Sequence, residues 1–188
     1  MQRSEREKML AGELYLASDP ELVALRRAAR TITREYNATT EDEPARREAL
    51  LRALFGGVGA RIEVEPPFRC DYGGNIRVGD GFYMNFDGVI LDCAAVEIGD
   101  QVFCGPGVHI YAATHPVRAS ERVRGPELAR PVRIGHRVWL GGRVVVCPGV
   151  TIGDDTTIAA GSVVTRDIPA RVLAGGNPCR VLRALDGP

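Results

Sequence analysis

The stretch that decides the fold is IGHRVWLGGRVVVCPGVTIGDDTTIAAGSVV, residues 134–164. An apolar residue returns there at every sixth position: Ile134, Leu140, Val146, Ile152, Ile158 and Val164. A second column follows four residues after each of the first five: Val138, Val144, Val150, Thr156 and Ser162. A period of six cannot keep side chains on one face of an α-helix, which repeats every 3.6 residues or so. The stretch therefore predicts short stacked strands joined by corners.

The same frame extends towards the amino terminus. Its first column continues there as Ile98, Cys104 and Ile110, its second as Val102 and Val108, and glycine often follows the first column, at Gly99, Gly105, Gly135, Gly141 and Gly153. Glycine suits a corner where a side chain would clash. We predict a solenoid whose strands stack about 4.7–4.9 Å apart. The alternative, a sandwich of short strands, does not keep one frame over such a distance. The period leaves the handedness open.

Two segments depart from the period of six. Residues 114–131, THPVRASERVRGPELARP, lapse into charge and proline and predict a loop that protrudes from the coils. Residues 5–57 are helical in pattern: Asp19 caps a helix that begins at Pro20, and a second helix spans about 42–55. The apolar stripe of the first helix comprises Leu22, Leu25, Ala29, Ile32 and Tyr36. Stripes this narrow predict helices that pack on something else.

Composition narrows the classes of function. Lys and Arg together number 24, as do Asp and Glu, so net charge gives no argument for a nucleic-acid or membrane partner. The charged start MQRSEREKML has no signal-peptide core, and no run of about 20 apolar residues is present. The five cysteines are odd in number and include no Cys-x-x-Cys pair, which argues against a disulfide framework or a zinc knuckle. We expect a cytoplasmic protein.

Several motifs in one order carry a family resemblance: AGELYLASDPEL, YNAT, PPFRCDYGGNIRVG, FYMNF, LDCAAVEIGD, ATHPV, VWLGG, CPGVTIGD, AAGSVVTRDIP and GGNPCRVLR. Over residues 5–183 the chain resembles the hexapeptide-repeat sugar O-acetyltransferases of the maltose, galactoside and nodulation group. The resemblance implies a left-handed parallel β-helix, a homotrimer with active sites between subunits, acetyl-CoA as donor and a sugar hydroxyl as acceptor. It also implies two parts: an acceptor-side helical segment, 1–57, and a β-helix acyltransferase domain, 58–188, with a CoA-binding tail.

Of the three histidines, only His115 is expected to do chemistry. By strand alternation His109 should face outward, and His136 falls in a turn. The resemblance assigns His115 as the general base. A neutral imidazole can take the proton of a sugar hydroxyl as its oxygen attacks the thioester, so no acyl-enzyme is required. Cys104 and Cys147 occupy interior or corner positions of the frame and are not expected to be nucleophiles.

The resemblance also assigns residues to the acyl and acceptor sites. Asn85, with the backbone N–H of Gly142, would face the thioester oxygen, although Gly142 also suits a plain coil corner. Asp71 and Asp92 would bind acceptor hydroxyls, although Asp92 also suits a coil corner. The remaining candidates for these sites are Trp139, in the acyl pocket or between subunits; Glu127, beside His115; and Asp19, as a sugar contact or only a helix cap.

The acceptor class follows from two departures. Galactoside enzymes have a second acidic residue where this chain has Cys93, and a serine where it has Asp71. The pattern favours the maltose and nodulation branch and leaves the acceptor itself open.

Donor binding is assigned to the carboxyl-terminal region. The resemblance places Arg166, Arg180 and Arg183 near CoA phosphates, which guanidinium groups bind well, with Ala160 and Thr165 along the pantetheine arm. Solvated arginines are the plain alternative.

Two other functions are compatible with a solenoid of this kind. One is a γ-class carbonic-anhydrase-like enzyme with zinc bound by His109, His115 and His136. The other is a trimeric scaffold without catalysis. The sugar acetyltransferase interpretation needs no metal.

Overall fold

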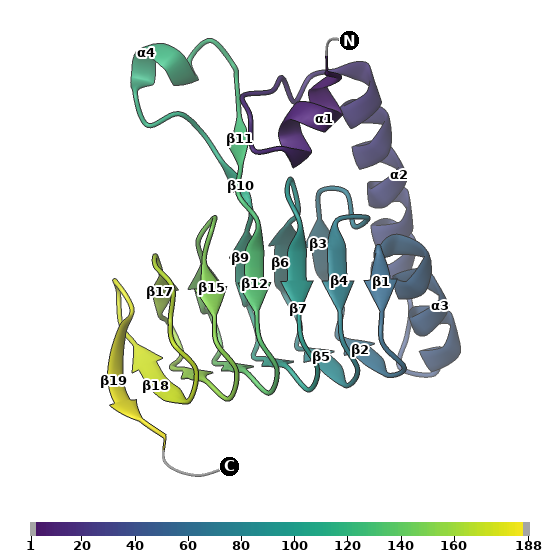
Figure 1. Cartoon of the computed structure of the whole chain (residues 1–188). Helices are drawn as coiled ribbons and strands as arrows, with labels where there is room; N and C mark the ends of the chain where they lie inside the picture. The colour runs from purple at the N-terminus through teal and green to yellow at the C-terminus, as the bar shows by residue number, and fades with distance from the viewer. Residues whose placement is uncertain (1–2, 186–188) are drawn as a thin grey trace.

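The computed structural model describes residues 3–185, which form a three-sided coil of parallel strands with helices at the end where the coil begins (Figure 1). The helical segment contains α1 (Glu5–Leu10), α2 (Pro20–Asn37) and α3 (Pro44–Leu54). The first sheet contains β1 (Gly57–Val58), β4 (Ile76–Val78), β7 (Val96–Ile98), β12 (Val132–Ile134) and β15 (Thr151–Ile152). The second contains β2 (Ile62–Val64), β5 (Phe82–Met84), β8 (Phe103–Cys104), β13 (Trp139–Leu140), β16 (Thr157–Ile158), β18 (Val172–Gly175) and β19 (Arg180–Ala184). The third contains β3 (Phe68–Cys70), β6 (Gly88–Leu91), β9 (His109–Tyr111), β14 (Val145–Val146) and β17 (Val163–Val164).

The two columns of the sequence form the interior of the coil. Ile134, Leu140 and Val146 are at most 3% exposed, and they lie on strands of the first, second and third sheets in turn. Eighteen residues later the chain returns to the same sheet, so that Ile134 is in register with Ile152. The predicted parallel β-helix is confirmed, and the sandwich alternative is wrong, because neighbours within each sheet come from successive coils.

The glycines of the frame are required by the spacing between coils. A Cβ built on Gly141 would lie 2.6 Å from the backbone nitrogen of Ala160, and one on Gly105 would lie 2.6 Å from that of Gly142. Real Cβ atoms do not approach backbone so closely. The predicted clash is confirmed, and its partner is the backbone of the next coil.

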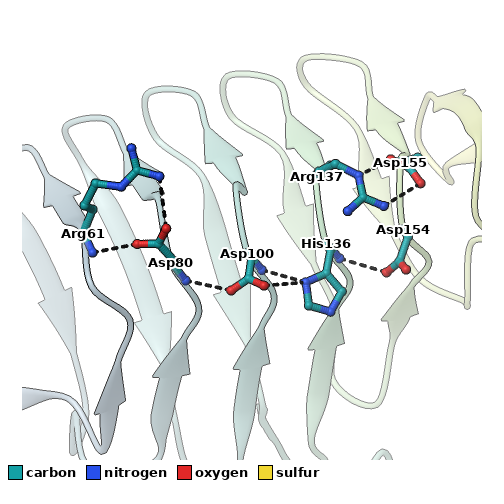
Figure 2. Close-up of polar contacts among 7 residues, drawn as sticks. All are labelled: Arg61, Asp80, Asp100, His136, Arg137, Asp154 and Asp155. Atoms are coloured by element: carbon teal, nitrogen blue, oxygen red, sulfur yellow. Dashed lines mark hydrogen bonds and ion pairs between the residues drawn. The ribbon is translucent and has the colours of Figure 1, made fainter. Parts of the chain in front are cut away.

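The corner between the first and second sheets carries a ladder of polar side chains, shown in Figure 2. Asp80 accepts the backbone N–H of Arg61 at 2.8 Å, and Asp100 accepts that of Asp80 at 2.8 Å. His136 takes the next place, because its Nδ1 accepts the N–H of Asp100 at 3.0 Å, and Asp154 then accepts the N–H of His136. His136 thus lies in a turn as predicted, where it is hydrogen-bonded to the coils on both sides.

The helical segment covers the first coils. Asp19 caps α2 by accepting the N–H of Glu21 at 2.9 Å, and Leu22, Ala29 and Tyr36 are buried as the stripe predicts. Asn37 then bonds both backbone groups of Phe68 on β3, at 2.8 and 2.9 Å. The second helix begins at Pro44, later than predicted, and β1 starts at Gly57, close to the expected boundary. Residues 1–2 and 186–188 of the two expected parts lie outside the described residues.

The loop at 114–131 protrudes as predicted but contains regular structure. β10 (Ala113–Thr114) and β11 (Leu128–Ala129) form an antiparallel pair, and α4 (Ala119–Arg122) lies at the tip. None of these elements was predicted, because they are too short to show a period. Figure 1 shows this hairpin beside α1, above the coils.

Candidate active site

The candidate residues for the donor lie mostly along one edge, the carboxyl ends of the strands of the second sheet. Asn85 follows β5, Gly142 follows β13 and Ala160 follows β16. Arg180 lies at the same edge, because its register partner is Gly175 at the end of β18. From β5 to β19 this sheet has five steps between strands, or about 24 Å. We call this row the second-sheet edge.

Aromatic side chains cover the outer face next to this edge. Trp139 is 55% exposed and Phe103 51% exposed, and the two are in register on adjacent strands. With Tyr83, Asn85 and Gly105 they line an open hollow of about 500 Å³. A second hollow of about 310 Å³ lies at the corner, where Gly142 is one of the lining residues. The edge therefore offers apolar walls beside exposed backbone.

A second set of candidates lies at the carboxyl ends of the third sheet. Asp71 follows β3, Asp92 follows β6, and Thr165 and Arg166 follow β17. His115 follows β10, which continues the chain from β9. We call this row the third-sheet edge. The structure thus divides the candidates between two corners of the coil.

At the third-sheet edge four side chains meet: Asp71 and Cys93 from the coils, Glu127 from the hairpin, and Tyr15 from the segment between α1 and α2, residues 11–19, which we call the amino-terminal arm. The Tyr15 phenol donates to Oε2 of Glu127 at 2.8 Å, and the Cys93 thiol donates to Oδ2 of Asp71 at 3.4 Å. Tyr15 lies beside Cys93 and so joins the two pairs. We call Tyr15, Asp71, Cys93 and Glu127 the arm cluster.

The electrostatics of the arm cluster follow from burial. Desolvation is the main cause that raises the pKa of Asp71, against the Cys93 hydrogen bond and the charges of Arg26 and Arg30. Burial also raises the pKa of Tyr15, with Cys93 and Glu127 adding to the effect, so the phenol remains a donor at neutral pH. The cluster is therefore a partly dry group of two carboxyls, a thiol and a phenol.

Asp92 lies beneath the cluster and is fully buried. Its carboxylate accepts the backbone N–H groups of Asp71 at 3.1 Å, Tyr72 at 2.8 Å and Asn75 at 3.2 Å. Burial raises the pKa of Asp92 to about 6, although backbone hydrogen bonds, among them those from Tyr72 and Asn75, lower it. Both oxygens are occupied within the chain, which favours the coil-corner role over direct acceptor binding.

The remaining candidates are placed as follows. His115 is exposed and follows β10, while His109 faces outward as predicted, with Nδ1 2.5 Å from the Tyr111 hydroxyl. Cys104 is buried, as predicted, which raises its pKa to about 12, and half-buried Cys147 also has a raised pKa. Arg180 and Arg183 lie on β19, where they donate to the backbone carbonyls of Cys179 and Ala184, respectively.

Tyr15 was not predicted from the sequence as a site residue, and neither were the residues that hold the amino-terminal arm in place. Arg26 donates to the carbonyl of Ala17 at 2.6 Å and to the Tyr72 phenol at 2.7 Å, and its guanidinium lies 5.7 Å from the Tyr72 ring centroid. The motif AGELYLASDPEL contains Tyr15, but nothing in its local spacing indicates a partner far along the chain.

Two findings concern other classes of function. Among residues 3–185, no three His, Cys, Asp or Glu side chains come together in a group that could hold a metal ion. In particular, His136 is engaged in the corner ladder between the first and second sheets, whereas His115 is at the third-sheet edge. Within the same residues, every helix is too short or too polar to cross a membrane.

Two family models match this chain, and proteins of known name are similar to it along most of its length. Residues 8–59 match the maltose acetyltransferase hexapeptide capping motif, and residues 131–166 match the bacterial transferase hexapeptide of six repeats. Nodulation protein L of Rhizobium meliloti is 50% identical over 181 residues, covering 96% of this chain and 99% of that protein.

Two solved structures are also similar along nearly the whole chain. A maltose O-acetyltransferase from Clostridium difficile 630 has a TM-score of 0.97 at 50% identity, covering 98% of this chain and 99% of the other. A galactoside acetyltransferase in complex with coenzyme A has a TM-score of 0.93 at 40% identity, covering 98% and 92%. The similarity therefore includes both the helical segment and the coils.

Proposed function

This chain belongs to the hexapeptide-repeat sugar O-acetyltransferases of the maltose, galactoside and nodulation group, and we propose that it transfers the acetyl group of acetyl-CoA directly to a sugar hydroxyl. The zinc enzyme and the scaffold are disfavoured, because the matched relatives include named acetyltransferases and one is bound to coenzyme A. The observation that carries the proposal is the placement of the candidate residues along two edges of one coil.

In the proposed reaction, His115 takes the proton of the acceptor hydroxyl while the hydroxyl oxygen attacks the thioester carbon. The carbonyl oxygen becomes negative in the tetrahedral intermediate, where the Asn85 amide and the Gly142 backbone N–H would donate to it. Collapse breaks the carbon–sulfur bond, leaves the acetyl ester on the sugar and releases CoA, whose sulfur recovers the proton from His115. His115 is exposed just beyond β10, where an acceptor hydroxyl can approach its imidazole.

The donor would lie along the second-sheet edge. Ala160 would line the extended pantetheine arm of CoA, and Trp139 would line the acyl pocket. Arg180 and Arg183 would supply positive charge at the far end of the edge. Arg166 and Thr165 lie on the third-sheet edge and would contact the same donor from a neighbouring subunit. The helical segment, 1–57, would lie on the acceptor side, because its Tyr15 belongs to the arm cluster with Asp71.

A homotrimer is expected, because one chain separates the two edges by the width of the third sheet. A strand of three residues, such as β9, is about 10 Å long, so His115 and Gly142 of one chain lie at different corners. A three-fold arrangement brings the second-sheet edge of one subunit to the third-sheet edge of the next and covers the aromatic face. Sedimentation should give about three chains per particle. A monomer with full turnover would contradict the shared site.

The acceptor class can be tested by a screen of sugars. With acetyl-CoA as donor and release of free thiol as the readout, we expect glucosides, maltose or glucosamine-containing oligomers to be acetylated faster than galactosides. The reason is the Asp71 and Cys93 pair, which differs from the serine and second acidic residue implied for galactoside enzymes. Omission of the sugar gives the background rate of hydrolysis. A preference for a thiogalactoside would show that this pair had been misinterpreted.

A further inference from the structure

The amino-terminal arm is joined to the hairpin that carries His115 by a backbone bridge. The Tyr15 N–H donates to the Glu127 carbonyl at 3.1 Å, and the Glu127 N–H donates to the Tyr15 carbonyl at 2.9 Å. The next residue, Leu128, is in register with Thr114, which directly precedes His115. This antiparallel β-bridge at Tyr15 therefore ties the amino-terminal arm to the β10 and β11 hairpin.

The side chain of Tyr15 continues the same connection. It is 1% exposed, and its phenol donates to Glu127 at 2.8 Å while lying beside Cys93, which in turn donates to Asp71. The phenol thus lies between the Glu127 carboxylate, to which it donates, and the Cys93 and Asp71 pair. Hydrogen bonds to a carboxylate are about twice as strong as neutral ones, so this phenol can fix the direction of the Glu127 carboxylate.

The arm that supplies Tyr15 is itself held in place. The Glu5 carboxylate accepts the N–H of Leu16 at 2.6 Å, and Arg26 donates to the carbonyl of Ala17 at 2.6 Å. Gly12 has a φ of +73°, and a Cβ there would lie 3.3 Å from the carbonyl of Ala129 on β11, so the arm passes close to the hairpin. Contacts on both sides of Tyr15 therefore restrict the position of its ring.

We propose that Tyr15 is a positioning residue for the acceptor site, holding the Glu127 carboxylate towards the Asp71 and Cys93 pair next to the hairpin of His115. This rests on the proposed function, since the acceptor is what the cluster would contact. Tyr15 acts through Glu127 and is not itself expected to touch the reacting atoms.

The test is Tyr15→Phe, which removes the hydroxyl and keeps the ring and the backbone bridge. We expect the KM for the acceptor to rise about tenfold, the order of effect of losing one hydrogen bond to a charged group, while kcat changes less than about threefold. The affinity for CoA should stay the same. Tyr36→Phe is the matched control, because Tyr36 is also a fully buried phenol of the helical segment but donates to the backbone of Val64. It should leave the acceptor KM unchanged.

A double variant separates positioning from a general loss of packing. If Tyr15 acts through Glu127, Tyr15→Phe combined with Glu127→Gln should raise KM no more than Glu127→Gln alone. An unchanged KM in Tyr15→Phe, or effects that multiply in the double variant, would overturn the proposal while leaving the acetyltransferase function intact. If the acceptor proves not to be a sugar, the proposed function fails, and the same comparison with the acceptor that is used still decides the role of Tyr15. A chain that acetylates no acceptor would overturn both.

Discussion

His115→Ala should lower kcat by about 100- to 10,000-fold, the usual effect of removing a positioned general base. The side chain is exposed beyond β10, so its removal leaves the coils and the second-sheet edge unchanged. Affinity for CoA should therefore stay within about twofold of the parent. The measurements are steady-state turnover at saturating acetyl-CoA and sugar, and CoA binding by calorimetry. Turnover within a few-fold of the parent would mean that the proton leaves by another route.

The contrasting variant replaces both Arg180 and Arg183 with alanine. These two residues lie on β19, at the far end of the second-sheet edge from Asn85. Their loss should weaken CoA binding in a way that depends on salt, because charge attraction is screened over about 10 Å at 0.1 M. Turnover at saturating donor should change much less than in His115→Ala. Equal defects in kcat for both variants would contradict the separate roles.

The fold was predictable because its information is local and repeated. Each coil needs an apolar residue at the equivalent position. The spacing of Ile134, Leu140 and Val146 therefore identifies interior positions without knowledge of any distant contact. Gly105 and Gly141 were predictable for the same reason, since every coil approaches the next at its corner. The hairpin at β10 and β11 was not, because two strands of two residues leave no period to detect.

The candidate site was predictable only in part. His115 stands out in the sequence because it begins the interruption of the repeat, and the family resemblance supplies its chemical role. Tyr15 and Glu127 are 112 residues apart, and their pairing depends on how the arm folds back over the first coils. The choice between two roles for Asp92 also needed the structure, because a coil-corner carboxylate and an acceptor ligand look the same in sequence.

Asp92→Ala should lower the free energy of unfolding by about 3 kcal/mol. The carboxylate is fully buried and accepts three backbone N–H groups, from Asp71, Tyr72 and Asn75. Alanine would leave these donors without a partner, at about 1–3 kcal/mol each, offset by the cost of burying the charge in the parent. Urea unfolding at one fixed protein concentration measures the difference, since assembly adds to apparent stability. Asp80→Ala is the control, because Asp80 accepts the N–H of Arg61 at an exposed corner where water can replace it.

The same pair of variants has opposite pH dependences. Burial raises the pKa of Asp92 to about 6 from its ordinary value of 3.8, so the folded protein binds this proton more tightly than the unfolded chain. The contribution of Asp92 is then largest in acid and is lost as pH rises through 6, which makes the gap between parent and Asp92→Ala about 1 kcal/mol larger at pH 5 than at pH 7. The hydrogen bond from the Arg61 side chain is the largest cause that lowers the pKa of Asp80. The stabilising contribution of Asp80 is therefore lost as pH falls through this lowered pKa. A gap for Asp92→Ala that shrinks on acidification would show that the backbone donors outweigh burial and hold this carboxylate ionised.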